Sequence, residues 1–358
     1  MNLDDRARKA PFPWFGGKSS VADAVWRRLG SPKQYIEPFC GSAAILLAAP
    51  RPASLEVIGD ANCYVANFWR ALKRQPDAVT DWQDYPVSHI DLYARHRWLT
   101  DPARVVALRS SLLDPEWPGD PQIAGWWLWG QCCWIGSGWC DPSRGQRGDG
   151  GAGDDGLGQI PHAGNAGMGV QATTLGKVPH VSNAGMGVQA TTLGKVPHVS
   201  DAGRGLGQIP FVSRQGMGAQ GMGAQGMVRE WLCALASRLE RVRVVHGDWS
   251  RCLNHHYGAS NTAIFFDPPY LAFEKLYSDA STPVAAEVAT WAREHGDLRI
   301  ALCGHRGDYD MPGWSVHDWS RGRLTYGGDA TTEAECIWYS PGCVPERKAQ
   351  PSLFEAVS

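Results

Sequence analysis

The chain has 358 residues, of which 43% are apolar, and this is enough to bury a full core in one large domain with an elaboration or in two domains. Its formal net charge of -2 excludes an overall basic protein, so any attraction to nucleic acid must come from a local patch. The charged start at residues 1–6 and the shortness of the longest apolar run, residues 43–49, argue against a membrane span and predict a soluble, cytoplasmic protein.

The ten cysteines include no Cys-x-x-Cys pair, and most of them lie in apolar stretches. We therefore predict reduced, packed thiols. Cys132, Cys133 and Cys140 are close together, but their spacing matches no standard zinc site, so no metal is predicted.

The first candidate site lies near the N-terminus. Residues 13–18 form a loop with two glycines, followed by a helix-start pattern in which Ser20 is the predicted N-cap. A strand over residues 34–38 then leads through a tight turn around Gly41 into a helix over residues 44–49. A glycine at such a turn lets a ligand approach the backbone, and the free amides of the helix start face that ligand.

A second strand, residues 55–59, ends at Asp60. An acid at this position, about 20 residues beyond the glycine turn, suits the hydroxyls of a ribose. Because the turn lacks the full Gly-x-Gly-x-x-Gly spacing, a dinucleotide is disfavoured. A cofactor with a single nucleoside fits better.

The middle of the chain loses this alternation of strands and helices and predicts a separate helical insertion. Helices are predicted over residues 62–74, 91–99, 102–113 and 121–135. Five tryptophans lie within residues 126–139. Tryptophan can stack on bases, but a helix that is apolar on every side is usually buried, so core is the favoured interpretation, with residues 136–139 as an exposed loop.

Several clusters of basic residues could contact nucleic acid, although a solvated helix face is the favoured interpretation of each. They are Arg27 with Arg28, Lys73 with Arg74, Arg95 with Arg97, and Arg238 with Arg241 and Arg243.

Residues 141–227 are rich in glycine and contain an internal repeat, since residues 165–182 recur without change as residues 183–200. The unit has too few large apolar residues to build a solenoid core easily. It is either a disordered, extensible loop or a glycine-lined stack of extended turns. His180, His198, Lys177 and Lys195 are solvated linker residues or, less favoured, phosphate contacts.

Regular structure is predicted to resume after the repeat, with helices over residues 228–239 and 283–294 and strands over residues 242–245, 263–266, 298–302, 314–316 and 336–339. The strand at residues 263–266 runs directly into Asp267, Pro268, Pro269 and Tyr270. The prolines cannot continue a sheet, so Asp267 and Tyr270 are predicted at the carboxyl end of a buried strand, where open α/β sheets bind ligands.

Three motifs in order, FGGK at residues 15–18, EPFCG at residues 37–41 and DPPY at residues 267–270, resemble those of Dam-type (alpha-group, D12 class) DNA adenine methyltransferases carried by bacteriophages. The resemblance covers residues 11–75 and 240–340. It implies an α/β, Rossmann-like S-adenosylmethionine-dependent methyltransferase fold, with a mixed, mostly parallel sheet and a large helical and Gly-rich insertion.

The implied domains are a methyltransferase domain in two parts, residues 1–80 and 228–345, with a target-recognition region at residues 81–140 and the repeat insertion at residues 141–227. Residues 346–358 form a tail.

The resemblance also implies the site residues. S-adenosylmethionine would be the cofactor, with Trp14 and Lys18 at its methionine part, Glu37, Phe39 and Gly41 in the loop beneath it, Asp60 at the ribose and Asp248 near the adenine ring. The family often has a second glycine where this chain has Ala43, but alanine is small enough to keep the turn.

The motif at residues 267–270 suits transfer of a methyl group to an aromatic amine. Such an amine is a poor nucleophile because its lone pair is delocalised into the ring. The Asp267 carboxylate and the Pro268 carbonyl would accept its hydrogens and stabilise the developing positive charge. Pro269 completes the turn, and Tyr270 would stack on the base once it has left the duplex.

The sequence thus predicts a site-specific methyltransferase that modifies the adenine amino group in double-stranded DNA. The enzyme is predicted to act as a monomer in the bacterial cytoplasm. Its purpose would be either protection of DNA from restriction or another form of DNA marking. An amino-methyltransferase of cytosine or RNA, and an inactive DNA-binding protein on the same scaffold, remain alternatives.

Overall fold

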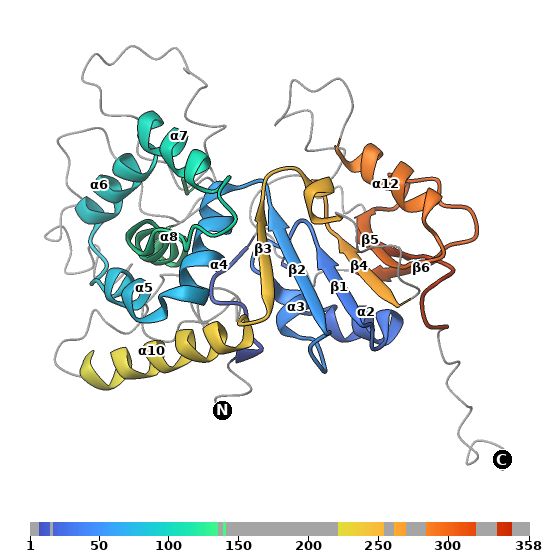
Figure 1. Ribbon diagram of the computed structural model, residues 1–358, viewed down its shortest axis with the longest axis horizontal. Coiled ribbons are helices and arrows are strands. Elements are labelled where there is room, and N and C mark those ends of the chain that lie inside the picture. The colour runs from blue at the N-terminus through green and yellow to red at the C-terminus, as the bar shows by residue number, and fades with distance from the viewer. Residues whose placement is uncertain are drawn as a thin grey trace, which may run out of the picture.

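The computed structural model describes residues 7–14, 17–134, 139–140, 221–253, 261–269, 284–319 and 335–345, and it is built around a seven-stranded sheet in the order β3-β2-β1-β4-β5-β7-β6 (Figure 1). Strands β3 to β5 in that order run parallel, and β7 is antiparallel to both β5 and β6. The fold is therefore α/β with a mostly parallel sheet, as predicted. The strands are β1 (Gln34–Glu37), β2 (Leu55–Asp60), β3 (Val242–His246), β4 (Thr262–Phe266), β5 (Arg299–His305), β6 (Ser315–Trp319) and β7 (Glu335–Tyr339).

Helices cover both faces of the sheet. Side chains on both sides of a central strand are therefore buried, which explains why the sequences of these strands are almost continuously apolar. Successive residues of a strand point to opposite faces. Tyr35 and Phe265 accordingly belong to a core cluster shared with α2, α3, α4 and α10, whereas Ile36 and Phe266 belong to a second cluster shared with η2 and α12.

The strand order reverses at β1, which pairs with β2 on one side and β4 on the other. Residues 34–36 lie beside residues 262–264, so two segments far apart in the sequence become neighbours at the centre of the sheet. In open parallel sheets the crevice outside such a reversal, at the carboxyl ends of the strands, is where ligands bind.

The helices lie close to their predicted positions, with three differences. Helix α5 was not predicted. Helix α10 begins seven residues before the predicted start at residue 228, because its glycine-rich first turns have low helix propensity and conceal it. Ser20 is not an N-cap, since Val21 precedes α2 and no side chain caps that helix. The helices are α2 (Ala22–Leu29), α3 (Ala44–Leu47), α4 (Cys63–Arg74), α5 (Pro76–Gln83), α6 (His89–Leu99), α7 (Pro102–Ser111), α8 (Pro121–Cys133), α10 (Gly221–Arg238), the 3-10 turn η2 (Trp249–Leu253) and α12 (Val284–Glu294).

Helices α5 to α8 stand at one side of the sheet, with α8 packed against α4 and α5 (Figure 1). The Asn67 side chain of α4 links that helix to the start of α8, where Asp120 is the N-cap. It donates to the carbonyl oxygen of Asp120 at 3.0 Å and accepts from the amide of Asp120 at 2.7 Å. Trp127 of α8 belongs to the same apolar cluster as the sheet residues. The helices and the sheet therefore share one core.

The tryptophan-rich run is mostly core, as favoured from the sequence. Trp127, Trp129 and Trp139 are buried. The prediction of an exposed loop was wrong for Trp139, whose ring packs so closely on Gly130 that any Cβ there would overlap it. Residues 136–138 lie outside the described residues.

Several basic residues that we expected on solvated faces have structural partners. The Arg95 guanidinium is buried and stacks on the rings of Tyr85 and Trp129, 3.8 Å and 4.4 Å from their centroids. Lys73 donates to the carbonyl oxygen of Val242 at 2.7 Å. These contacts could not be seen in the sequence because each partner is distant along the chain or across a helix.

All ten cysteines carry free thiols, and only Cys133 and Cys233 are even partly exposed. Among the described residues, no cluster of three His, Cys, Asp or Glu side chains is arranged to hold a metal ion. In the same part of the chain, no helix is both long and apolar enough to span a membrane.

The two hydrogen bonds between the Asn67 side chain and the Asp120 backbone, called here the Asn67 clamp, allow a test of how α8 is attached to α4. Asn67→Ala leaves the Asp120 amide without its acceptor and the Asp120 carbonyl with only its bond from the Ala124 amide, in a partly buried place. We therefore expect the free energy of unfolding in urea to fall by about 2 kcal/mol. Gln75→Ala is the matched control, because Gln75 makes a single, partly buried bond to the Gly119 carbonyl, and its loss should cost about 1 kcal/mol or less. Equal losses in the two variants would contradict the proposed importance of the clamp.

Candidate functional site

The carboxyl edge of the central strands brings together residues from four separate stretches of the sequence. The amide of Gly41, after β1, donates to Oδ2 of Asp60 at the end of β2 at 2.9 Å. Lys18 Nζ, from the N-terminal loop, lies 2.8 Å from Oδ1 of Asp267, the first residue after β4. This edge is the candidate site.

The turn between β1 and α3 is sharply bent. Gly41 has a φ of +43° and Ala43 a φ of +51°, both in the left-handed region. The Cys40 amide donates to the Gly59 carbonyl at 2.8 Å, and Trp69 Nε1 donates to the Gly41 carbonyl at 2.9 Å. A left-handed alanine costs about 1–2 kcal/mol, so these bonds hold the turn in a conformation that it would not adopt alone.

Trp14 lies directly against Gly41, where a Cβ would overlap its indole ring. The indole is itself held by aromatic contacts, with its centroid 5.9 Å from that of Phe12 and 6.3 Å from that of Trp127. Gln131 of α8 donates to the carbonyl of Pro13, the residue before Trp14, at 3.1 Å. The glycine at this position is thus required by an aromatic neighbour within the chain as well as by the positive φ.

Glu37 lies beneath the turn and is almost fully buried. Its Oε2 accepts from the Tyr35 hydroxyl at 2.9 Å and from the Leu46 amide at 3.0 Å. Burial raises the pKa of Glu37 to about 8, although these two hydrogen bonds act in the opposite direction. Glu37 therefore joins the end of β1 to α3.

Asp60 has both oxygens occupied by backbone amides, since Oδ1 accepts from Asn62 at 2.8 Å and Oδ2 from Gly41. Burial raises its pKa to about 6, against the effect of those bonds. Its side chain is partly exposed, and each carboxylate oxygen has a second lone pair, so the group can still accept a hydroxyl from a ligand.

The Lys18 and Asp267 side chains are 3% and 19% exposed, so the cation is enclosed and the carboxylate has an open side. Burial is the largest influence on the pKa of Lys18 and acts to lower it, but the Asp267 carboxylate, with smaller contributions from Cys303 and Glu335, outweighs burial and the pKa is raised. The ammonium therefore stays charged. After Asp267 the chain buries Pro268 and exposes Pro269, while Tyr270 lies outside the described residues.

Phe39 and Asp248 lie on the same edge of the sheet as the Lys18–Asp267 pair. Phe39 is partly exposed and its ring centroid is 6.5 Å from that of Phe266, the residue before Asp267. Asp248 is exposed and accepts from the amide of Ser250 at 3.0 Å at the start of η2. It follows Gly247, whose amide donates to the Asp60 carbonyl at 3.1 Å.

Comparison with known proteins bears on this edge. Residues 14–97 match the family described as D12 class N6 adenine-specific DNA methyltransferase. We call residues 14–97 the D12 segment because of this match. A relative, the DNA N-6-adenine-methyltransferase of Escherichia phage P1, is 33% identical over 79 residues, which are 21% of this chain and 10% of that protein. Both matches support the family predicted from the motifs, over the first part of the resemblance.

The D12 segment contains the predicted residues Trp14, Lys18, Glu37, Phe39, Gly41 and Asp60. Asp248 and Asp267 lie beyond it, and the fold carries them to the same edge. Sequence reasoning missed Trp69, which bonds to the turn, and His246, a buried residue beside Asp60 in the register of β2 and β3. Their sequence neighbourhoods contain no motif, because each acts through a partner on another element.

The close contact at Gly41 predicts a large effect of one methyl group. Gly41→Ala must relieve both the left-handed backbone and the overlap with Trp14, so we expect the free energy of unfolding to fall by about 2–4 kcal/mol in urea titrations. The double variant Gly41→Ala with Trp14→Ala should lose less than the two single variants added together, because it removes the overlap. A Gly41→Ala protein as stable as the parent would show that the turn is not constrained in this way.

Glu37 predicts a pH dependence of stability. Its pKa is about 8 in the folded chain and 4.5 is the ordinary value, so the folded state binds the proton more tightly. The resulting stabilisation is complete below the ordinary pKa and is lost as the pH rises through about 8. Asp60 acts in the same direction, with a pKa of about 6 against 3.8.

We therefore expect the free energy of unfolding to fall between pH values of about 5 and 9, and to fall less in Glu37→Gln, whose side chain stays neutral and can still accept from Leu46. Urea unfolding at a series of pH values measures this. Glu240→Gln changes an exposed glutamate and is the control, expected to follow the parent protein. A Glu37→Gln profile as steep as that of the parent would contradict the assignment.

Proposed function

We propose that the protein transfers a methyl group from S-adenosylmethionine to the exocyclic amino group of adenine in DNA. The observation that carries the proposal is the Lys18–Asp267 pair at 2.8 Å, because it joins the D12 segment to the Asp-Pro-Pro motif in a single site. The strand order, with β7 antiparallel at the far side, supports a Rossmann-like methyltransferase sheet.

The residues at the edge suit the proposed cofactor. Asp60 offers carboxylate oxygens to ribose hydroxyls at the tip of β2, and the Gly41 turn lies beside it. Trp14 lies against that turn and the partly exposed Phe39 belongs to it, so both offer apolar surface there, and Asp248 is an exposed acceptor for an adenine amine. When bound, the sulfonium of S-adenosylmethionine supplies an electrophilic methyl group.

Asp267 has the exposure and the charge that this reaction needs. Lys18 contacts Oδ1, and the partly exposed side chain leaves Oδ2 as the oxygen that is proposed to accept a hydrogen from the amine. The Pro268 carbonyl is proposed to accept the second hydrogen. As the carbon–nitrogen bond forms and the bond from that carbon to the sulfonium sulfur breaks, with its electron pair staying on sulfur, positive charge would develop on the nitrogen. The Asp267 carboxylate would stabilise this charge, and one amine proton would leave through Asp267 to solvent. Tyr270 is proposed to stack on the adenine ring.

We propose duplex DNA as the substrate, residues 81–140 as the target-recognition region and a monomer, in the bacterial cytoplasm, as the working form. Exposed arginines on α6 and α7 support this assignment, since Arg97, Arg104 and Arg109 all face solvent. Residues 141–227 are proposed as a repeat insertion between the two parts of the methyltransferase domain.

The test is product analysis. Incubation of unmethylated duplex DNA with the protein and S-adenosylmethionine, followed by mass spectrometry of the nucleosides, should give N6-methyladenine. Asp267→Asn keeps the shape of the side chain but removes its charge, and we expect the rate to fall at least about 100-fold while cofactor binding persists.

Asp318→Asn, which changes an exposed acid paired with Arg306, is the matched control and should retain the parent rate. Cofactor binding without any methyladenine, or methylcytosine as the product, would overturn the proposal.

A further inference from the structure

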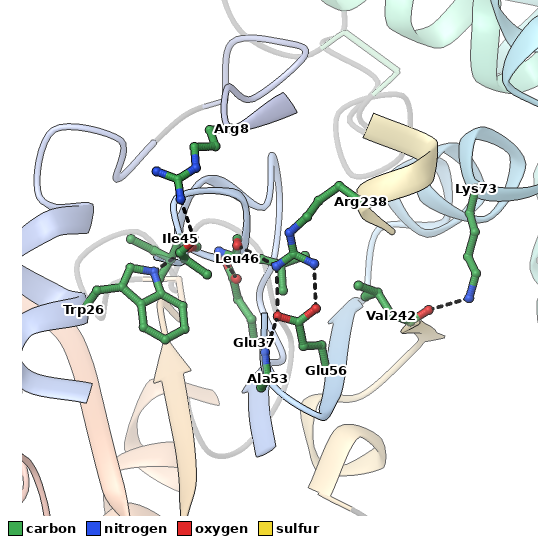
Figure 2. Close-up of polar contacts among 11 residues, drawn as sticks. Arg8, Trp26, Glu37, Ile45, Leu46, Ala53, Glu56, Lys73, Arg238 and Val242 are labelled. Atoms are coloured by element: carbon green, nitrogen blue, oxygen red, sulfur yellow. Dashed lines mark hydrogen bonds and ion pairs between the residues drawn. The ribbon is translucent and has the colours of Figure 1, made fainter. Parts of the chain in front are cut away.

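Helix α3, which follows the glycine turn, is held by side chains from distant parts of the chain. It has only four residues, too few to be stable on its own. Trp26 Nε1 donates to the Ile45 carbonyl at 2.7 Å, and Arg238 Nη2 donates to the Leu46 carbonyl at 3.1 Å (Figure 2). Because Glu37 accepts from the amide of Leu46, this one residue is fixed at both its N–H and its C=O.

Arg238 reaches Leu46 from the last position of α10, and its orientation is fixed by a second contact. Its Nη1 lies 2.6 Å from Oε2 of Glu56 and its Nη2 lies 2.8 Å from Oε1, so two hydrogen bonds join the planar guanidinium to the planar carboxylate (Figure 2). The Glu56 side chain is 2% exposed and that of Arg238 is 14% exposed. Glu56 also accepts from the Ala53 amide at 3.2 Å. A bidentate pair of this kind allows little rotation of the guanidinium.

The contact at Leu46 is transmitted to the turn by the backbone. The Leu47 amide donates to the carbonyl of Ala43 at 2.9 Å, and the Ala43 amide donates to the carbonyl of Cys40 at 2.6 Å. A shift of Leu46 therefore moves the two left-handed residues of the turn, Gly41 and Ala43.

We propose that Arg238 is a positioning residue for the cofactor turn at residues 39–43, acting through the Leu46 carbonyl, with Glu56 fixing the direction of its guanidinium. This inference rests on the proposed function, because the turn is the proposed cofactor loop. The contact joins α10 to Leu46 of α3, which lies 192 residues away in the sequence.

The experiment separates positioning from simple stabilisation. Arg238→Met and Glu56→Met each leave a buried charge without its partner, so each lowers the free energy of unfolding. The double variant removes both charges and recovers much of that stability. The Leu46 carbonyl keeps its bond from the Ala49 amide at 3.2 Å but loses the guanidinium donor that links it to α10. The dissociation constant of S-adenosylmethionine, measured by calorimetry, should therefore stay raised by about tenfold in the double variant.

Amide exchange supplies a second measurement that does not depend on cofactor. In the double variant without ligand, peptides covering residues 39–47 should exchange faster than in the parent protein, while peptides of β4 and β5 should not change. Arg229→Met is the matched control, because Arg229 lies on the same helix and pairs with Asp77 and Asp81, away from α3. It should leave both measurements unaltered.

A double variant with parental affinity and parental exchange at residues 39–47 would overturn the inference. A parent protein that fails to bind S-adenosylmethionine would overturn the proposed function instead, and exchange at residues 39–47 would then decide alone whether Arg238 holds the turn.

Discussion

A lysine ammonium cannot stay charged in a protein interior without a compensating partner, and this constraint shapes the centre of the molecule. Lys18 belongs to the N-terminal loop and is 3% exposed, and its carboxylate partner Asp267 comes directly after β4. Either group alone would be a buried or half-buried charge of high cost. The pair therefore favours the arrangement in which β4 lies against β1 and the Asp-Pro-Pro turn faces the N-terminal loop.

The glycine turn is held by a second set of contacts, some of which act on the turn itself and some on helix α3, which follows it. Trp14 covers Gly41 from above, and the Gly41 carbonyl accepts from Trp69. Below, Glu37 and Arg238 fix Leu46. None of these contacts is strong in isolation, yet together they hold a non-glycine residue, Ala43, in a left-handed conformation. Preorganisation of this kind means that a ligand need not order the loop when it binds.

Local sequence predicted the strands and their tips well, because an apolar run followed by an acid, a glycine or prolines leaves few alternatives. Asp60 and Asp267 were found in this way. The partners could not be found, because they are long-range: Arg238 was one of several basic residues expected on a solvated face, and its pairing with Glu56 depends on how β2 and α10 pack. Helix α10 was shortened in the prediction because glycine weakens helix propensity, whereas packing against α4 and α5 stabilises the helix in the fold.

Helices α8 and α10, which flank residues 141–220, are both anchored on α4 and α5. The two ends of this connection are thus fixed by contacts that do not involve the repeat. The entropic cost of closing a connection grows slowly with its length, by about 0.6 kcal/mol for each doubling. On that basis, gain or loss of one 18-residue copy by recombination between the identical units would be nearly neutral for the sheet. Evolution can change the length of the chain here without disturbing the edge where Lys18 meets Asp267.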